Sequence, residues 1–127
     1  MWIVDTALKS RADQNKPIRV GIIGAGFMCQ GLTNQITRST PGMRVAAISN
    51  RRIGRAVDVF HYSGIVDVAV AGSQRELDTA VEGSKPVVTE DAMLIARSDA
   101  IDVLVDVTGS VEFGARVALD EIRIVDA

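Results

Sequence analysis

The stretch from Pro17 to Ile36, PIRVGIIGAGFMCQGLTNQI, indicates the fold of the whole chain. Its apolar run at 18–23 is typical of a buried parallel strand, and it leads directly into Gly24-Ala25-Gly26. From Met28 onward, apolar residues recur every four positions, which is the spacing of one helix face. A strand, a glycine-rich turn and a helix in this order form the first βα unit of a dinucleotide-binding fold.

The glycines of this turn suit phosphate binding. Gly24 permits the tight turn out of the strand, and Gly26 has no Cβ, so a pyrophosphate can approach the backbone. The following helix N-terminus offers free N–H groups and the positive end of its dipole. We therefore predict cofactor binding at Gly24, Ala25, Gly26, Phe27 and Met28. The alternative is a glycine-rich structural turn without a ligand.

Composition limits the class of protein. The 127 residues suit one domain, and 47% hydrophobic with 24% charged residues is typical of globular proteins. The net charge of −2, with no basic cluster, argues against nucleic acid or a membrane surface as partner. No apolar run approaches the ~20 residues that span a bilayer. One cysteine cannot form an internal disulfide, so we expect a reducing, cytoplasmic location.

The second expected strand, 43–49, is followed by residues that bear on the choice of cofactor. In NAD-binding units an Asp or Glu about 20 residues past the glycines bonds the adenosine ribose. This strand instead ends in Asn50-Arg51-Arg52, and a guanidinium group offers several planar donors to a phosphate. The pattern favours NADP over NAD, with all three residues at the adenosine side. Alternatively, Arg51 and Arg52 are solvated residues at a helix start.

The remaining elements alternate between helix and strand. We predict helices from about 27 to 38, from 53 to an end at Ser63-Gly64, from the capping box Ser73–Glu76 to Gly83, and after Thr89. The last of these has Glu90 and Asp91 in its first turn. Further strands are expected at 65–70 and 101–107, with a possible edge strand at 122–126, whereas 86–88 is expected only as a short extended piece. This order predicts a doubly wound, Rossmann-type α/β domain with a mainly parallel sheet at 17–127, after an N-terminal helix or linker at 1–16.

Thr108-Gly109-Ser110 follow the strand at 101–107, and ligands of open α/β sheets bind outside the carboxyl ends of strands. Thr108 and Gly109 are therefore candidates for the nicotinamide side of the cleft. The alternative is that Ser110 simply caps the next helix.

Two single residues favour structural interpretations. Cys29 stands in the first turn of a helix, where a thiolate is favoured, but it also occupies the third small position of the glycine fingerprint. We interpret it as a packing residue. The single histidine, His61, is expected on the surface near a helix end. No cluster has metal-ligand spacing, and we predict neither a metal site nor a catalytic residue.

Residues 11 to about 120 resemble the N-terminal cofactor domain of a homoserine dehydrogenase-like family. The resemblance rests on RVGIIGAGFM (19–28), AAISNRR (46–52), KPVVTEDAMLIARSDAIDVLVDVTGSVEFGA (85–115) and their order. This family consists of NAD(P)-dependent oxidoreductases, often with a C-terminal SAF domain, and includes enzymes similar to deoxyxylulose-phosphate reductoisomerase. Cys29 departs from the family's pattern, which usually has glycine at that position.

The resemblance implies a cofactor cleft formed by Gly24, Gly26, Asn50, Arg51 and Thr108-Gly109, with hydride chemistry completed by a second domain. The ending EIRIVDA does not look like the family's continuation, which suggests truncation or a frame change. We expect an NADP(H)-binding domain that is inactive alone and that self-associates or docks on the missing catalytic domain. Alternatives are a non-enzymatic NAD(P) sensor or interaction module, and an adenosyl-methionine-binding domain.

Overall fold

The structure is a computed structural model, and it describes residues 17–108 and 124–126. In chain order the elements are β1 (Ile18–Ile23), α2 (Phe27–Ser39), β2 (Met43–Ser49), α3 (Ile53–Tyr62), β3 (Ala69–Val70), α4 (Gln74–Glu82), β4 (Val87–Thr89), α5 (Ala92–Ala96), β5 (Val103–Asp106) and β6 (Ile124–Asp126). The N-terminal segment 1–16 and the segment that follows Thr108, both with predicted helices, lie outside the described residues.

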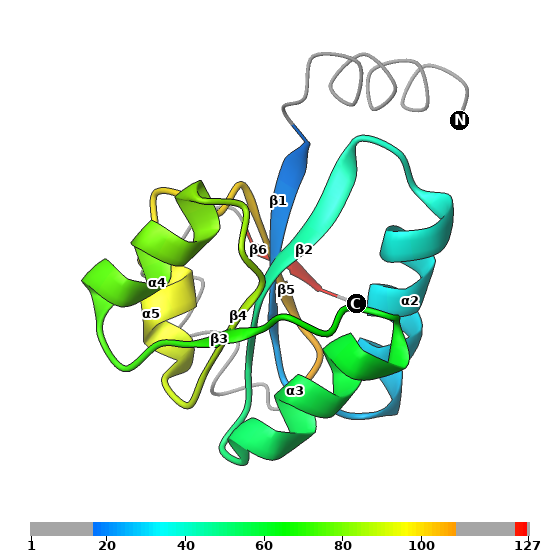
Figure 1. Cartoon of the computed structure of the whole chain (residues 1–127), viewed down its shortest axis with the longest axis horizontal. Coiled ribbons are helices and arrows are strands. Elements are labelled where there is room, and N and C mark those ends of the chain that lie inside the picture. The colour runs from blue at the N-terminus through cyan, green and yellow to red at the C-terminus, as the bar shows by residue number, and fades with distance from the viewer. Residues whose placement is uncertain (1–16, 109–123, 127) are drawn as a thin grey trace.

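The strands form one sheet in the order β3-β4-β2-β1-β5-β6, and every neighbouring pair is parallel. β1 lies inside the sheet, where Ile18 pairs with Met43 of β2 and Val20 pairs with Val103 of β5. Because the strands are parallel, their carboxyl ends meet at one edge of the sheet. Figure 1 shows this edge at the bottom of the view, where α2 and α3 begin.

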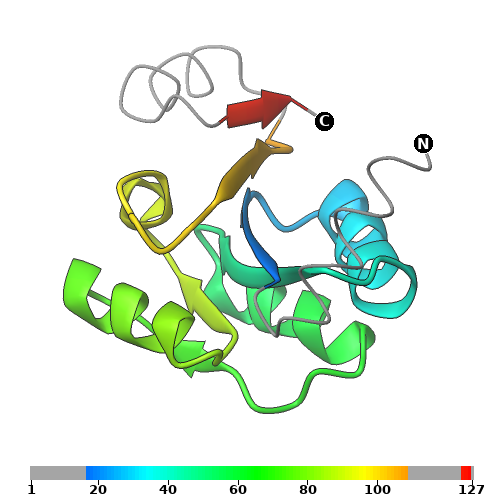
Figure 2. The same cartoon turned by 90° about the horizontal axis from the view of Figure 1, so that it is seen from above.

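Helices cover both faces of the sheet (Figures 1 and 2), with α2 and α3 on one face and α4 and α5 on the other. The interior strands are apolar in both directions: Val20 and Ile22 pack toward α2 and α3, whereas Ile23 packs toward α4 and α5. The layers have separate cores, with Phe60 fully buried in the first and Leu77 fully buried in the second. The predicted doubly wound α/β fold is confirmed.

Gly21 explains how closely α5 can approach the sheet. A Cβ at this position would collide with Ile95 of α5 and lie 3.2 Å from Cγ2 of Ile101. Gly21, in the middle of β1, therefore serves helix–sheet packing rather than the phosphate turn.

The strand predictions were accurate for β1 and β2 and too long for β3 and β5. Only Ala69–Val70 of the expected strand 65–70 pairs with a neighbour among the described residues, and that neighbour, β4, is itself short. The strand expected at 101–107 is limited to Val103–Asp106, and the possible edge strand is present as Ile124–Asp126. β4 corrects the prediction of a mere extended piece: it is an interior strand, buried throughout.

The start of α5 differs from the prediction. The N-cap is Asp91, whose Oδ1 accepts the Met93 N–H at 3.0 Å, and the first turn contains no acidic residue. Thr89 instead belongs to β4, where its Oγ1 accepts the Asp91 N–H at 3.2 Å. Ser73 caps α4 as predicted, since its Oγ accepts the Glu76 N–H at 3.2 Å, while Glu76 Oε1 accepts the N–H of Gly72 at 3.3 Å.

Candidate functional site

A cleft of about 690 Å³ lies at the carboxyl edge of the sheet. Four strands contribute to it: Gly24 follows β1, Asn50-Arg51-Arg52 follow β2, Glu90-Asp91 follow β4, and Thr108 follows β5. β1 and β5 are adjacent strands, but the chain continues from them in opposite lateral directions: from β1 to β2 on one side, and from β5 to β6 on the other. The cleft thus lies at a topological switch point, the usual ligand position in open α/β sheets.

Gly24 has the geometry that a tight strand-to-helix turn requires. Its φ is +104°, a conformation that residues with a Cβ rarely adopt, and its N–H donates to the Ser49 carbonyl at 2.9 Å. An added Cβ would lie 3.3 Å from Cγ2 atoms of Val107 and Thr108. Only glycine therefore lets the chain leave β1 close to the end of β5.

The rest of the glycine turn borders the cleft less directly. Ala25 is buried, whereas Gly26 is exposed, and a Cβ on Gly26 would meet nothing within 4 Å. Gly26 is the N-cap of α2, where no side chain caps the helix and the first turn contains no acid. The first N–H groups of such a helix lack intrahelical partners, so open space and free donors coincide here. Phe27 is 92% exposed and Met28 is 55% exposed, and neither lines the cleft.

Cys29 is fully buried beneath this turn. Burial raises the pKa of its thiol to about 11, and a contact of Sγ with Thr33 Oγ1 at 3.8 Å lowers the pKa by less. The side chain is therefore a neutral thiol near pH 7, in agreement with the packing interpretation and against a thiolate at the helix start.

Three arginines line the cleft where β2 passes into α3. Asn50 organises this crossing, because its side-chain amide donates to the Arg52 carbonyl at 3.0 Å. Arg51 and Arg52, both predicted, are exposed and line the cleft, and they are joined there by Arg55, which we did not predict. Arg55 lies in the first turn of α3, three residues after the N-cap Arg52. That spacing was the available signal.

The opposite wall of the cleft was also missed. Glu90 and Asp91 follow β4, and the apolar side chains of Ala92 and Met93 continue the wall into α5. Identifying β4 as an interior strand would have placed both carboxylates at the carboxyl edge of the sheet. The missing signal was weak, because a strand of three residues has no recognisable periodicity.

Thr108 lines the cleft at the end of β5, as predicted. Both its N–H and its Oγ1 hydroxyl donate to Asp106 Oδ1, at 2.9 and 2.7 Å, which holds its side chain toward the strand end. Gly109, predicted beside it, lies outside the described residues.

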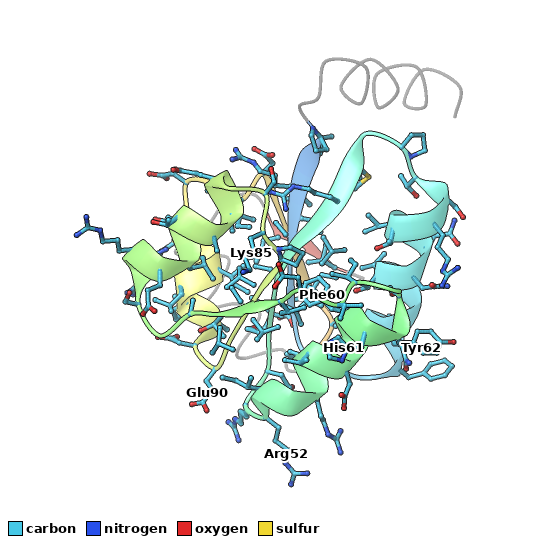
Figure 3. The ribbon with its side chains drawn as sticks, viewed as in Figure 1. Arg52, Phe60, His61, Tyr62, Lys85 and Glu90 are labelled. Carbon is cyan, nitrogen blue, oxygen red and sulfur yellow. The ribbon has the colours of Figure 1, made fainter. Side chains whose placement is uncertain are left out.

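The described ranges, 17–108 and 124–126, also bear on metal binding and membrane insertion. They contain no group of three or more His, Cys, Asp or Glu side chains placed to hold a metal ion. None of the helices in residues 17–108 is long and apolar enough to cross a membrane. His61 is exposed in the last turn of α3, at the other end of that helix from Arg52 (Figure 3).

Fold and cleft together define a Rossmann-type α/β domain with a ligand-sized site at its switch point. No protein-family model matches the chain. The chain is 31% identical over 108 residues to the homoserine dehydrogenase of Methylobacillus glycogenes, a match that covers 85% of this chain and 23% of that enzyme. It thus spans about a quarter of the length of that relative.

Two solved structures share the fold. Both are mutants of KijD10, a 3-ketoreductase from Actinomadura kijaniata, in complex with TDP-benzene and NADP. The TM-scores are 0.57 and 0.58 at 21% and 19% identity, over 87% of this chain and 29% and 28% of those chains. At such identities the likeness establishes the architecture.

Proposed function

We propose that this chain is the NADP(H)-binding domain of a homoserine dehydrogenase-like oxidoreductase. The observation that carries the proposal is one cleft at the switch point that joins the Gly24 turn to three arginines. The similarity to a homoserine dehydrogenase supports the enzyme class, and the NADP held by the KijD10 structures supports the cofactor. The proposal includes membership of the homoserine dehydrogenase-like family described above, whose members often carry a C-terminal SAF domain.

The residues present fit the phosphates of NADP. The open space in front of Gly26 and the uncapped start of α2 suit the pyrophosphate, which needs close backbone approach and N–H donors. Arg51, Arg52 and Arg55 line the same cleft and would hold the 2′-phosphate through charge-assisted hydrogen bonds from their guanidinium groups. Thr108 borders the nicotinamide side at the end of β5.

Bound NADPH would supply a hydride, and in our proposal another domain supplies the groups that hold and protonate the substrate. We expect no turnover by the chain alone. Reduction of an aldehyde, or isomerisation of a sugar phosphate, by the purified chain with NADPH would contradict this part of the proposal. If the chain binds NADPH and no catalytic domain accompanies it in the cell, the non-enzymatic sensor becomes the better description.

The proposal includes a covering partner, either the catalytic domain or a second copy of the chain, and a reducing, cytoplasmic location. Phe27 and Met28, adjacent in the chain and both exposed, support a partner at the start of α2. Sedimentation of the purified chain tests self-association. A strictly monomeric chain whose sedimentation is unchanged by Phe27→Ser would leave the catalytic domain as the remaining partner.

Calorimetric titration with NADPH and with NADH tests the cofactor assignment. We expect the double variant Arg51→Ala/Arg52→Ala to bind NADPH about tenfold or more weakly, because it loses charge-assisted hydrogen bonds to the 2′-phosphate. NADH has no 2′-phosphate, so its affinity should change little. The matched control is Arg75→Ala, which removes an exposed arginine of α4 outside the cleft. Failure of the wild type to bind either dinucleotide would overturn the proposal.

A further inference from the structure

The cleft carries opposite charges on two neighbouring strands. The arginines follow β2, and Glu90 follows β4, whose end is held beside β2 because the Asn50 N–H donates to the Thr89 carbonyl at 3.1 Å. Figure 3 shows Arg52 and Glu90 at the same end of the molecule, on different elements. Among residues 17–108, neither Glu90 nor any of the three cleft arginines forms a side-chain ion pair. Both charges are therefore open to a ligand.

Glu90 differs from the acidic residue beside it. Asp91 is engaged in capping α5, where its Oδ1 accepts the Met93 N–H at 3.0 Å. Glu90 has an exposed side chain that lines the cleft, and its carboxylate takes part in no such cap. Next to it, Ala92 and Met93 present an apolar surface, and Met93 is itself supported by the core under α4 and α5. An apolar wall beside a hydrogen-bond acceptor is suited to a flat heterocycle with an amino group.

The order of the strands indicates which part of the cofactor would reach the wall formed by Glu90, Ala92 and Met93. This step rests on the proposed function, which places the pyrophosphate at the end of β1 and the adenosine ribose at the end of β2. β4 is the next strand outward from β2. The base, attached to that ribose, would therefore be directed toward Glu90, and the nicotinamide half would lie on the other side, toward β5.

We propose that Glu90 selects adenine as the base of the bound dinucleotide by accepting a hydrogen bond from its 6-amino group. An ionised carboxylate can only accept, and adenine carries an amino donor at position 6, where hypoxanthine and guanine carry a carbonyl acceptor. With either of those bases an oxygen would face the carboxylate. The arginines thus select the phosphate on the ribose, and Glu90 selects the base.

The test compares NADPH with its deaminated analogue, which has hypoxanthine in place of adenine, by calorimetric titration of the purified chain. We expect the wild type to bind NADPH about tenfold more tightly than the analogue, because the analogue cannot form the charge-assisted hydrogen bond to Glu90. In Glu90→Gln this ratio should fall to about twofold or less, because a side-chain amide can donate as well as accept. Since each ratio is taken within one variant, a general loss of affinity cancels.

Glu82→Gln is the matched control, because Glu82 is an exposed carboxylate of α4 outside the cleft and its removal should leave the tenfold ratio intact. An equal ratio in the wild type and in Glu90→Gln would overturn the assignment of Glu90. Equal binding of both dinucleotides by the wild type would also overturn it while leaving the NADP proposal standing. If the wild type binds neither, the proposed function fails and this inference fails with it.

Discussion

Replacing Gly24 with alanine should destabilise the domain by an amount that its surroundings allow us to estimate. The φ of +104° is costly for a residue with a Cβ, by about 1–3 kcal/mol. The new Cβ would also lie 3.3 Å from methyl groups of Val107 and Thr108, closer than ordinary van der Waals contact, so the end of β5 must shift. Alanine lowers the entropy of the unfolded chain and recovers about 0.4–1 kcal/mol. The net loss is on the order of 2 kcal/mol.

Urea unfolding followed by circular dichroism measures this loss. With a urea dependence of about 1–3 kcal/mol per molar, the midpoint should fall by roughly 1 M. Gly31→Ala is the control, since Gly31 is an exposed residue of α2 with nothing within 4 Å of an added Cβ, and it should stabilise by about 1 kcal/mol. A Gly24→Ala midpoint equal to or above that of the wild type would refute the turn geometry.

Gly26→Ala separates binding from folding. Alanine is a poorer N-cap than glycine but stiffens the unfolded chain, so the two effects nearly cancel and stability should change by less than about 1 kcal/mol. The new Cβ would point into the open space proposed for the pyrophosphate. We expect weaker NADPH binding at nearly unchanged stability, and unchanged binding would remove Gly26 from the proposed site.

The remaining predictions concern two buried positions. Gly21→Ala should lower the free energy of unfolding by about 1–3 kcal/mol, because its Cβ would collide with Ile95 and force α5 away from the sheet; an unaltered urea midpoint would contradict this. Cys29 should resist alkylation at pH 8 in the folded chain and react once urea unfolds it. Because burial raises the pKa of this thiol from 9.0 to about 11, its contribution to stability is complete below pH 9 and is lost as pH rises toward 11. That loss is on the order of 2 kcal/mol and should disappear in Cys29→Ala, a comparison that thermal melts across this pH range can make.

Sequence patterns were sufficient where a structural signal is local and long. The strand at 18–23, the Gly24 turn and the helix that follows formed as predicted. A short, mainly apolar run bounded by Pro17 and by glycines favours a strand, and the four-residue repeat after it favours a helix. The arginines after β2 were found for the same reason, since they directly follow a long buried strand. The glycine turn and the start of α2 also formed where expected. Of the residues predicted there, however, Gly24 lines the cleft, whereas Ala25, Gly26, Phe27 and Met28 do not.

Short strands, and features that depend on contacts between distant segments, were not predictable in this way. β4 has three residues, and its burial comes from β2 and β3 on either side and from helices on both faces rather than from its own pattern. The strand expected at 65–70 was shortened in a similar way, because only Ala69 and Val70 pair with the short strand β4. Because residues 86–88 were not predicted to be a strand of the sheet, Glu90 was not predicted to lie in the candidate site.

The sequence by itself determined the class of fold, the glycine turn and a basic preference at the end of β2, because each depends on neighbours within a few residues. Only the tertiary structure decided which side chains share one cleft. Arg52 and Glu90 are far apart in the chain and meet at the same edge because β2 and β4 are parallel neighbours. Strand order is a property of the assembled sheet. The sequence alone therefore could not show that the arginines and Glu90 line opposite walls of one site.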